Sequence, residues 1–209
     1  MNLMDSFSPV NDAAALRENY PPPSERARLK TLRKLDPHCR QFIALSPFLC
    51  LGTSGAQGGD VTPRGDRPGF VHVLDDQRLA IPDWPGNNRL DSFANILENP
   101  RVGLLFLIPG VDETLRVNGT AIITGDPQIL SRWDVDGKHP RAALVVTVHE
   151  AFLHCGKALI RSRLWDPASR IDRSALPSYG QMLKDQVAVS ESAQEIEVSI
   201  ADAYKNKLY

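Results

Sequence analysis

The feature that most constrains the fold is a series of short strand-like segments separated by turn residues. In residues 114–124, for example, apolar and polar side chains alternate, so one face of a strand is apolar and the other polar. Strand character is found in residues 48–54, 61–64, 70–74, 78–81, 102–108, 114–124 and 142–155. Because only one clear helix lies among these segments, the pattern predicts a mainly β, α+β protein built on an antiparallel barrel with flanking helices.

The one clear helix among the strands is expected to end before Asn99 and Pro100. Its apolar residues follow the i, i+3, i+4, i+7 spacing of a helix face. These residues are Leu90, Phe93, Ala94 and Leu97. Asn88 is expected to cap the helix, because an asparagine side chain can accept a hydrogen bond from a free main-chain N–H.

Residues 10–46 are predicted to be helical, with a break at residues 20–24. Three consecutive prolines in this break cannot donate the hydrogen bonds of a helix interior, and Ser24 can cap the helix that follows. We therefore expect a helical extension over residues 1–46. The barrel and its C-terminal helices are expected to form one domain over residues 47–209.

Composition excludes several classes of protein. The 209 residues carry 24 Lys and Arg against 25 Asp and Glu, so a net charge of −1 gives no general attraction to nucleic acid or anionic membranes. The longest apolar run, residues 102–108, falls far short of the roughly 20 residues that span a bilayer. Three widely spaced cysteines form no Cys-x-x-Cys, and the first residues lack the pattern of a secretory signal. We expect a cytoplasmic protein with free thiols.

The familiar catalytic motifs are absent. The chain has no Gly-x-Gly-x-x-Gly, no Walker loop and no Gly-x-Ser-x-Gly. His149 and His154 are five residues apart, so they diverge on a helix and face opposite sides of a strand, and no metal site is predicted. The glycines in residues 52–59 can cradle a phosphate, but a hairpin turn explains them more simply.

Two arginines occupy positions where an anion is readily bound. Arg64 stands at a strand end before a glycine, and Arg89 stands at the start of the expected helix, where free N–H groups and the helix dipole attract anions. Each also has a simpler interpretation. Arg64 can pair with Asp66, and Arg89 can be an ordinary surface charge or pair with a neighbour on the helix.

The order of these elements resembles the pyridoxamine 5′-phosphate oxidase-like superfamily of FMN-binding split β-barrels, over residues 47–165. The best-matching segments are Asn87-Asn88-Arg89, Glu98-Asn99-Pro100 and Arg116-Val117-x-Gly119. A further pattern between His154 and Trp165 is similar to that of a bacterial branch of the superfamily. The resemblance rests on the order and spacing of these segments, since none of them is diagnostic alone.

The resemblance implies an FMN site. Arg64 and Arg89 would neutralise the phosphate, because arginine stays charged and offers a planar fork of donors. The main chain at residues 62–66 and 81–83 would run beside the isoalloxazine ring, and Thr114 would donate to a ring oxygen. The cofactor-binding set implied in this way is Arg64, Gly65, Asp66, Ile81, Pro82, Asp83, Asn88, Arg89, Thr114, Arg116, Lys157, Arg161 and Trp165.

The resemblance also implies a homodimer, since the flavin of this superfamily lies at a two-fold interface. Lys157, Arg161 and Trp165 are candidates for a contribution from the second subunit. Simpler interpretations stay open: Arg116 can be an exposed strand residue, Lys157 a solvated charge, and Trp165 a core or interface anchor.

The activity implied is that of an FMN-dependent oxidoreductase acting on a small molecule. The substrate-binding Arg-x-His signature of the true oxidases is missing after Trp165, which argues against pyridoxamine phosphate as substrate. The alternative is a flavin-binding sensor, or a cofactor or haem carrier, on the same barrel, and a deazaflavin can replace FMN in such a barrel. No general acid or base is assigned.

Overall fold

The computed structural model describes residues 9–209 and divides them into two compact units, residues up to Thr31 and Leu32–Tyr209. The first unit contains α1 (Ala13–Glu18) and α2 (Glu25–Leu29) on either side of the proline segment. Ser24 caps α2 as expected, because its hydroxyl accepts from the N–H of Ala27 at 3.3 Å. The first eight residues of the expected N-terminal extension lie outside the described residues.

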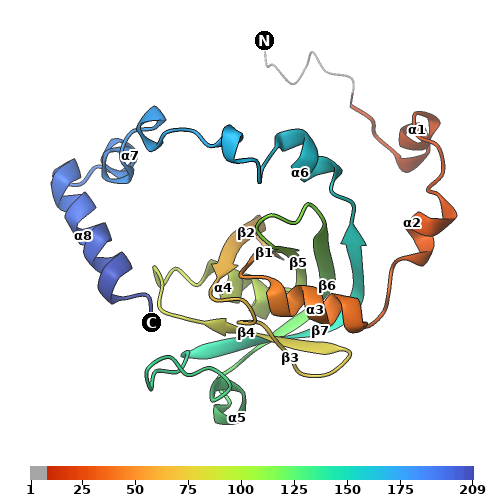
Figure 1. Ribbon diagram of the computed structural model, residues 1–209, viewed down its shortest axis with the longest axis horizontal. Coiled ribbons are helices and arrows are strands. Elements are labelled where there is room, and N and C mark those ends of the chain that lie inside the picture. The colour runs from red at the N-terminus through yellow and green to blue at the C-terminus, as the bar shows by residue number, and fades with distance from the viewer. Residues whose placement is uncertain (1–8) are drawn as a thin grey trace. The chain divides into compact units, whose positions relative to one another are not determined.

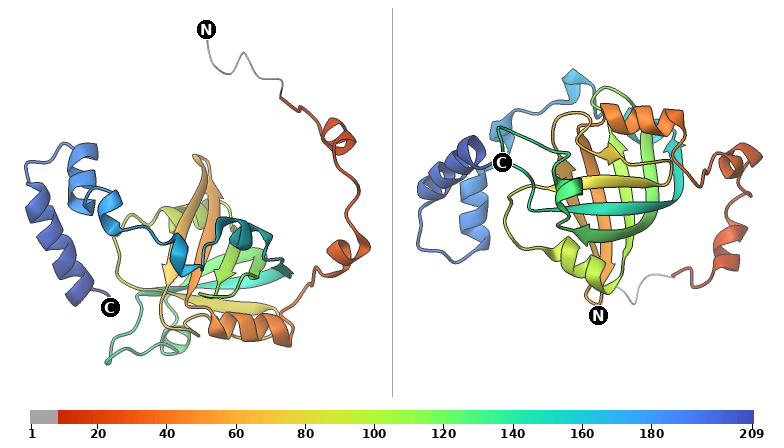
Figure 2. Two further views of the ribbon diagram at one scale, coloured as in Figure 1. Left: turned by 45° about the horizontal axis from the view of Figure 1, so that its top comes forward. Right: turned by 90° about the horizontal axis from the view of Figure 1, so that it is seen from below.

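The second unit begins with α3 (Pro37–Leu45), which lies against the barrel (Figures 1 and 2). Asp36 caps this helix, and its apolar face places Cys39, Phe42 and Ile43 in the barrel core. The compact units therefore separate between residues 31 and 32, and not after residue 46 where the sequence suggested a boundary. The reason is burial: α3 completes the core of the strands and belongs with them.

Seven strands form one antiparallel sheet in the order β2-β1-β5-β6-β7-β4-β3. The strands are β1 (Phe48–Gly55), β2 (Gly58–Gly65), β3 (His72–Val73), β4 (Arg78–Asp83), β5 (Arg101–Leu107), β6 (Thr114–Thr124) and β7 (Ala142–His154). The sheet curls but does not close, so the protein is a split barrel, as predicted. The hairpin turn expected in the glycine-rich residues 52–59 is present between Gly55 and Gly58, and β3 pairs with β4 across a turn at residues 75–77.

Alternate side chains of the central strands fill the core, which explains the period of two in the sequence. Leu115 and Val117 of β6 and Leu144 and Val146 of β7 are at most 1% exposed. The register of β6 and β7 shifts between Asn118 and the following Gly119. A Cβ at position 119 would collide with the main-chain oxygen of Thr147, so this bulge requires glycine.

Helix α4 (Asp91–Glu98) follows β4 and packs on β1, β2 and β6. Asn88 does not cap it, so that prediction was wrong: the cap position is Leu90, in the left-handed conformation with no side-chain hydrogen bond, and Asn88 is also left-handed. The buried residues are Ser92 and Ile96, whereas Leu97 of the predicted apolar face is 79% exposed. On the inward face, Ile96 packs in the barrel core, and Asn95 Nδ2 donates to Thr53 Oγ1 of β1 at 3.1 Å.

The remaining helices lie outside the sheet. They are α5 (Pro127–Leu130), α6 (Lys157–Ser162), the short 3-10 turns Pro167–Ser169 and Arg173–Ala175, and the paired helices α7 (Tyr179–Gln186) and α8 (Ala193–Asn206). After α8 the chain returns to the barrel, beside the loop between β4 and α4 (Figure 1). Among the described residues, no helix has the length and apolar character needed to cross a membrane.

Candidate functional site

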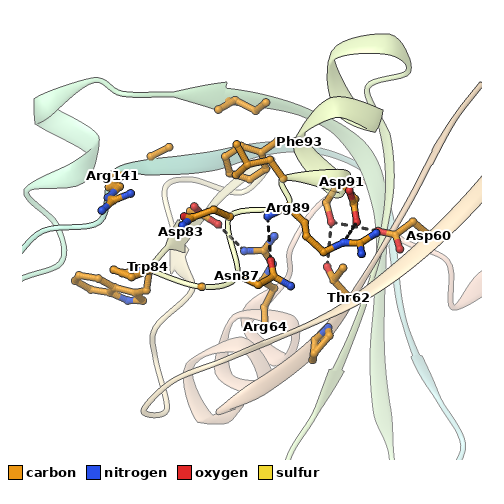
Figure 3. A pocket seen from close by; sticks show the side chains of 18 residues that line it. Asp60, Thr62, Arg64, Asp83, Trp84, Asn87, Arg89, Asp91, Phe93 and Arg141 are labelled. Carbon is orange, nitrogen blue, oxygen red and sulfur yellow. Dashed lines mark hydrogen bonds and ion pairs between the residues drawn. The ribbon is translucent and has the colours of Figure 1, made fainter. Parts of the chain in front are cut away.

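A cavity of about 780 Å³ opens beside the loop that joins β4 to α4 (Figure 3). Its walls come from β2, the end of β4, the loop over residues 84–90, the first turn of α4, and the adjoining ends of β6 and β7. Sites for small ligands and cofactors typically measure roughly 300–1,000 Å³, so this cavity has a suitable size. Four residues that the sequence indicated for cofactor binding line it: Arg64, Asp83, Asn88 and Arg89.

Arg64 is the most enclosed of the three arginines that line the cavity. Its Nη1 donates to Asp83 Oδ1 at 2.6 Å, and the two side chains are only 22% and 20% exposed. The Nε of Arg64 is buried and has no acceptor among the described residues. The indole N–H of Trp84, in the same cavity, is also buried without an acceptor among the described residues. Because a buried donor without an acceptor is costly, both atoms suit a ligand that supplies oxygen or nitrogen acceptors.

The partner of Arg64 differs from the one considered from the sequence. Asp66 accepts from the main-chain N–H of Arg67 at 2.7 Å and from the hydroxyl of Tyr209 at 2.6 Å. Asp83 lies on β4, which is far from β2 in the order of the sheet. The two strands approach only because the sheet curls, and this proximity decides the ion pair.

Arg89 stands at the rim, with 72% of its side chain exposed. Its Nε donates to Asp91 Oδ2 at 2.7 Å, and its main-chain N–H donates to Asn87 at 3.1 Å. The Asp91 carboxylate, and more weakly that of Asp60, raise the pKa of Arg89, which stays charged. Arg89 uses one donor on Asp91, so its outer N–H groups remain able to bind a second acceptor.

A third arginine, Arg141, was missed by the sequence reasoning. It is exposed, directly precedes β7, and lies on the opposite side of the cavity from Asp60 (Figure 3). It makes no hydrogen bond or ion pair with any other described residue. The only sequence signal was a basic residue at the start of a strand, and the pairing of Ala142 with Asp83 is what brings it to the cavity.

Polar groups on the α4 side complete the lining. The buried hydroxyl of Ser92 lies 3.1 Å from Thr62 Oγ1 and donates to Asp60 Oδ2 at 3.3 Å. The carboxylates in the cavity thus equal the arginines in number: Asp60, Asp83 and Asp91 face Arg64, Arg89 and Arg141. An anion entering here meets two guanidinium groups that carboxylates orient, those of Arg64 and Arg89, and the exposed Arg141.

Other residues of the predicted set flank the cavity without lining it. Ile81 and Pro82 are buried in β4 opposite Leu144 and Ala143, so only their main chain can serve a neighbouring ligand. Gly65 pairs with Phe48 at the end of β2. Asp66 follows it, turned towards Tyr209.

The remaining predicted residues lie elsewhere in the chain, at the opposite end of β6. Ile123 of β6 lines the cavity, and residues 114–123 of an extended strand cover roughly 30 Å. Arg116 donates from Nη2 to Glu150 Oε1 at 3.0 Å, and its guanidinium carbon lies 4.1 Å from the centre of the Phe152 ring. Its Nε is buried without an acceptor among the described residues.

Near this end of β6 the chain turns through residues 155–165. Thr114 is buried opposite His154. Lys157 and Arg161 project from α6, which follows β7, and both are exposed. Trp165 donates its indole N–H to the main-chain oxygen of Val111 at 2.8 Å. Within one chain, therefore, the predicted residues form two groups rather than one site. We call the group at Thr114, Arg116, Lys157, Arg161 and Trp165 the distal group.

Comparison with known proteins finds similarity over the part of the chain that contains the seven strands. Residues 35–155, more than half of the chain, match the family model described as pyridoxamine 5′-phosphate oxidase. No curated protein matches the sequence.

Several solved structures are similar over about half of the chain, at low sequence identity. HupZ of Group A Streptococcus is 16% identical over 56% of this chain and 92% of its own, with a TM-score of 0.47. A Clostridium acetobutylicum protein related to general stress protein 26, of the pyridoxinephosphate oxidase family, is 14% identical over 56% and 86% (TM-score 0.43). An FMN-binding protein from Syntrophomonas wolfei is 16% identical over 55% and 82% (TM-score 0.43). On the evidence of the family match, the chain belongs to the pyridoxamine 5′-phosphate oxidase family.

Proposed function

We propose that this protein binds FMN, with the phosphate in the cavity, and works as an FMN-dependent oxidoreductase on a small molecule. The observation that carries the proposal is the buried Nε of Arg64, a charged donor without an acceptor among the described residues, in a cavity that two further arginines line. Phosphate oxygens are the acceptors that a guanidinium fork fits best. Membership of the family supports the same cofactor.

The residues of the cavity have distinct tasks in this proposal. Arg64, Arg89 and Arg141 bind the phosphate, and the hydroxyls of Thr62 and Ser92 add neutral donors. Asp83 pairs with the Arg64 guanidinium through the 2.6 Å contact, and the phosphate would compete with it for this donor. When bound, FMN would supply two-electron redox chemistry, while the protein supplies position and positive charge.

The distal group has a place in this proposal only if two chains combine. None of its residues lines the cavity of its own chain, and Thr114 and Arg116 lie towards the opposite end of β6 from Ile123, which does. We propose a homodimer in which the distal group of one chain completes the cavity of its partner. The buried Nε of Arg116 supports this, since it too lacks an acceptor among the described residues.

Cofactor binding is tested with the purified protein. We expect a yellow protein, or uptake of FMN in calorimetry, and FMN as the compound released on denaturation. Replacing Arg89 by alanine removes a charge-assisted contact, which corresponds to about ten- to hundredfold weaker binding. Arg170→Ala, an exposed arginine outside the cavity, is the matched control. A colourless protein that does not bind FMN would refute the proposal.

The shared site is tested by mixing two binding-deficient variants, Arg64→Ala and Arg116→Ala. A mixed dimer contains one cavity with both changes and one with neither, so mixing should restore up to half of the FMN-binding capacity of the mixed dimers. If each variant alone is dimeric and mixing with subunit exchange restores nothing, the two groups do not form one site.

Turnover is tested by anaerobic addition of NADH or NADPH followed by air. Rapid bleaching of the flavin spectrum and its recovery in air support an oxidoreductase. An inert spectrum favours the alternative, a flavin-binding carrier or sensor.

A further inference from the structure

Tyr209 contacts the barrel through three different groups. Its hydroxyl donates to Asp66 Oδ1 at 2.6 Å, and its ring meets the ring of Trp84 edge-on, with 5.0 Å between centres. Its main-chain oxygen accepts from Lys138 Nζ at 3.0 Å. The phenol is partly buried, and the hydrogen bond to Asp66 together with this burial raises the pKa of Tyr209.

These three partners lie in the three segments that carry the arginines of the cavity. Asp66 follows Arg64 at the end of β2. Trp84 begins the loop that contains Arg89, and it lines the cavity itself. Lys138 lies in the connection that leads from α5 to Arg141.

Arg64 is held in β2 by the pairing with β1, whereas the other two segments have little regular structure of their own. The loop over residues 84–90 ends in two left-handed residues, Asn88 and Leu90, before α4 begins. In the connection before β7, Asp136 and Gly137 also have positive φ. A residue that contacts all three segments therefore restricts how far the arginines can move apart.

Tyr209 reaches this position at the end of the arm formed by residues 166–209, which lies outside the matched region 35–155. Within the arm, α7 packs on α8, and Gly180 N–H bonds to the Glu197 carboxylate. Gly180 is the one buried residue that the two helices contain. The arm thus contributes no residue to the barrel core, whereas Tyr209 contacts the barrel and its loops at three places.

We propose that Tyr209 is a positioning residue that links the three segments bearing Arg64, Arg89 and Arg141, so that the arm sets the geometry of the anion site. The nature of the anion rests on the proposed FMN function. The link itself does not, because every contact that makes it is internal to the chain. Tyr209 touches no ligand in this proposal and acts through Trp84, Asp66 and Lys138.

The experiment compares Tyr209→Ala and Tyr209→Phe with the control Tyr204→Ala. Tyr204 lies on α8 of the same arm and is 64% exposed, so its loss tests the arm without the link. FMN affinity is measured by calorimetry, and hydrogen exchange is measured in the ligand-free protein over residues 84–90 and 134–141. A melting curve for each variant shows whether the whole fold is affected.

We expect Tyr209→Ala to weaken FMN binding about tenfold or more and to speed exchange in both segments, with β5 and β6 unchanged. Tyr209→Phe keeps the ring contact and should recover much of the affinity, with a residual loss of about three- to tenfold for the missing hydrogen bond. Tyr204→Ala should match the wild type.

Three results would overturn the link: unchanged affinity and exchange in Tyr209→Ala, an equal loss in Tyr204→Ala, or faster exchange throughout the barrel. If the wild type itself does not bind FMN, the proposed function fails. Exchange in the ligand-free variants then decides the link alone, with faster exchange confined to the two segments supporting it and unchanged exchange refuting it.

Discussion

The ion pair between Arg64 and Asp83 allows a test in which two substitutions have a similar effect on stability and different effects on binding. Arg64→Met keeps much of the side-chain volume and removes the charge, whereas Asp83→Asn keeps the shape and removes the opposite charge. Both remove the ion pair between strands β2 and β4. Only the first removes a donor to the ligand.

The expected loss of stability follows from burial. Breaking a fully buried pair costs about 3–5 kcal/mol, and an exposed pair contributes about 0–1 kcal/mol. With 22% and 20% of the side chains exposed, this pair falls between these limits. We expect each variant to lose about 1–2 kcal/mol of unfolding free energy, measured by urea titration followed by tryptophan fluorescence.

The expected effects on FMN affinity diverge. Arg64→Met removes charge-assisted hydrogen bonds of about 1.5–3 kcal/mol, which corresponds to about ten- to hundredfold weaker binding. Asp83→Asn removes a carboxylate that competes with the phosphate for Arg64, so binding should be unchanged or stronger. The control is Asp75→Asn, which breaks the exposed Arg78 pair and should change neither quantity measurably.

The FMN affinities of the three variants are measured by calorimetry. Arg64 is not a phosphate ligand if Arg64→Met binds FMN as tightly as the wild type. If Asp83→Asn loses as much affinity as Arg64→Met, Asp83 does not compete with the ligand, and the orientation of Arg64 matters more than its availability.

Three further results are expected. The hydrogen bond that the Tyr209 phenol donates to the Asp66 carboxylate raises the pKa of Tyr209 above 10.0. This hydrogen bond therefore stabilises the fold fully below pH 10, and the stabilisation is lost as the pH rises through the raised pKa. Melting temperatures of the wild type and Tyr209→Phe should converge at alkaline pH. Burial raises the pKa of Cys39 to about 11. At about pH 8 a thiol reagent should therefore label the exposed Cys155 quickly and Cys39 only on unfolding. Mass spectrometry of the labelled peptides measures both. Gly119→Ala should cost about 1–3 kcal/mol of unfolding free energy in urea titration because its Cβ meets the facing strand, and Gly125→Ala, with open space around it, should cost far less.

Local patterns were enough to predict most of the elements. Alternation over residues 114–124 identified β6, and the glycines in residues 52–59 located the hairpin between β1 and β2. The prolines after Tyr20 separated α1 from α2. These features depend on neighbouring residues and on main-chain geometry, which the sequence states directly.

The candidate site depends on distant residues, and there the sequence alone was insufficient. It indicated Arg64 and Arg89, but the only partner it offered for Arg64 was Asp66 rather than Asp83, and it gave no reason to select Arg141. Asp83 is the partner because the sheet curls, which brings β4 close to β2 although the two strands are far apart in the order of the sheet.

The sequence by itself therefore determined which segments are strands, where they turn, and which side chains bear the charge. Tertiary structure alone decided which of these charges meet, which face of α4 is buried, and that Tyr209 contacts the segments around the cavity. The physical reason is that strand order, register and curl arise from the packing of the whole core. They cannot be inferred from the residues next to a given position in the sequence.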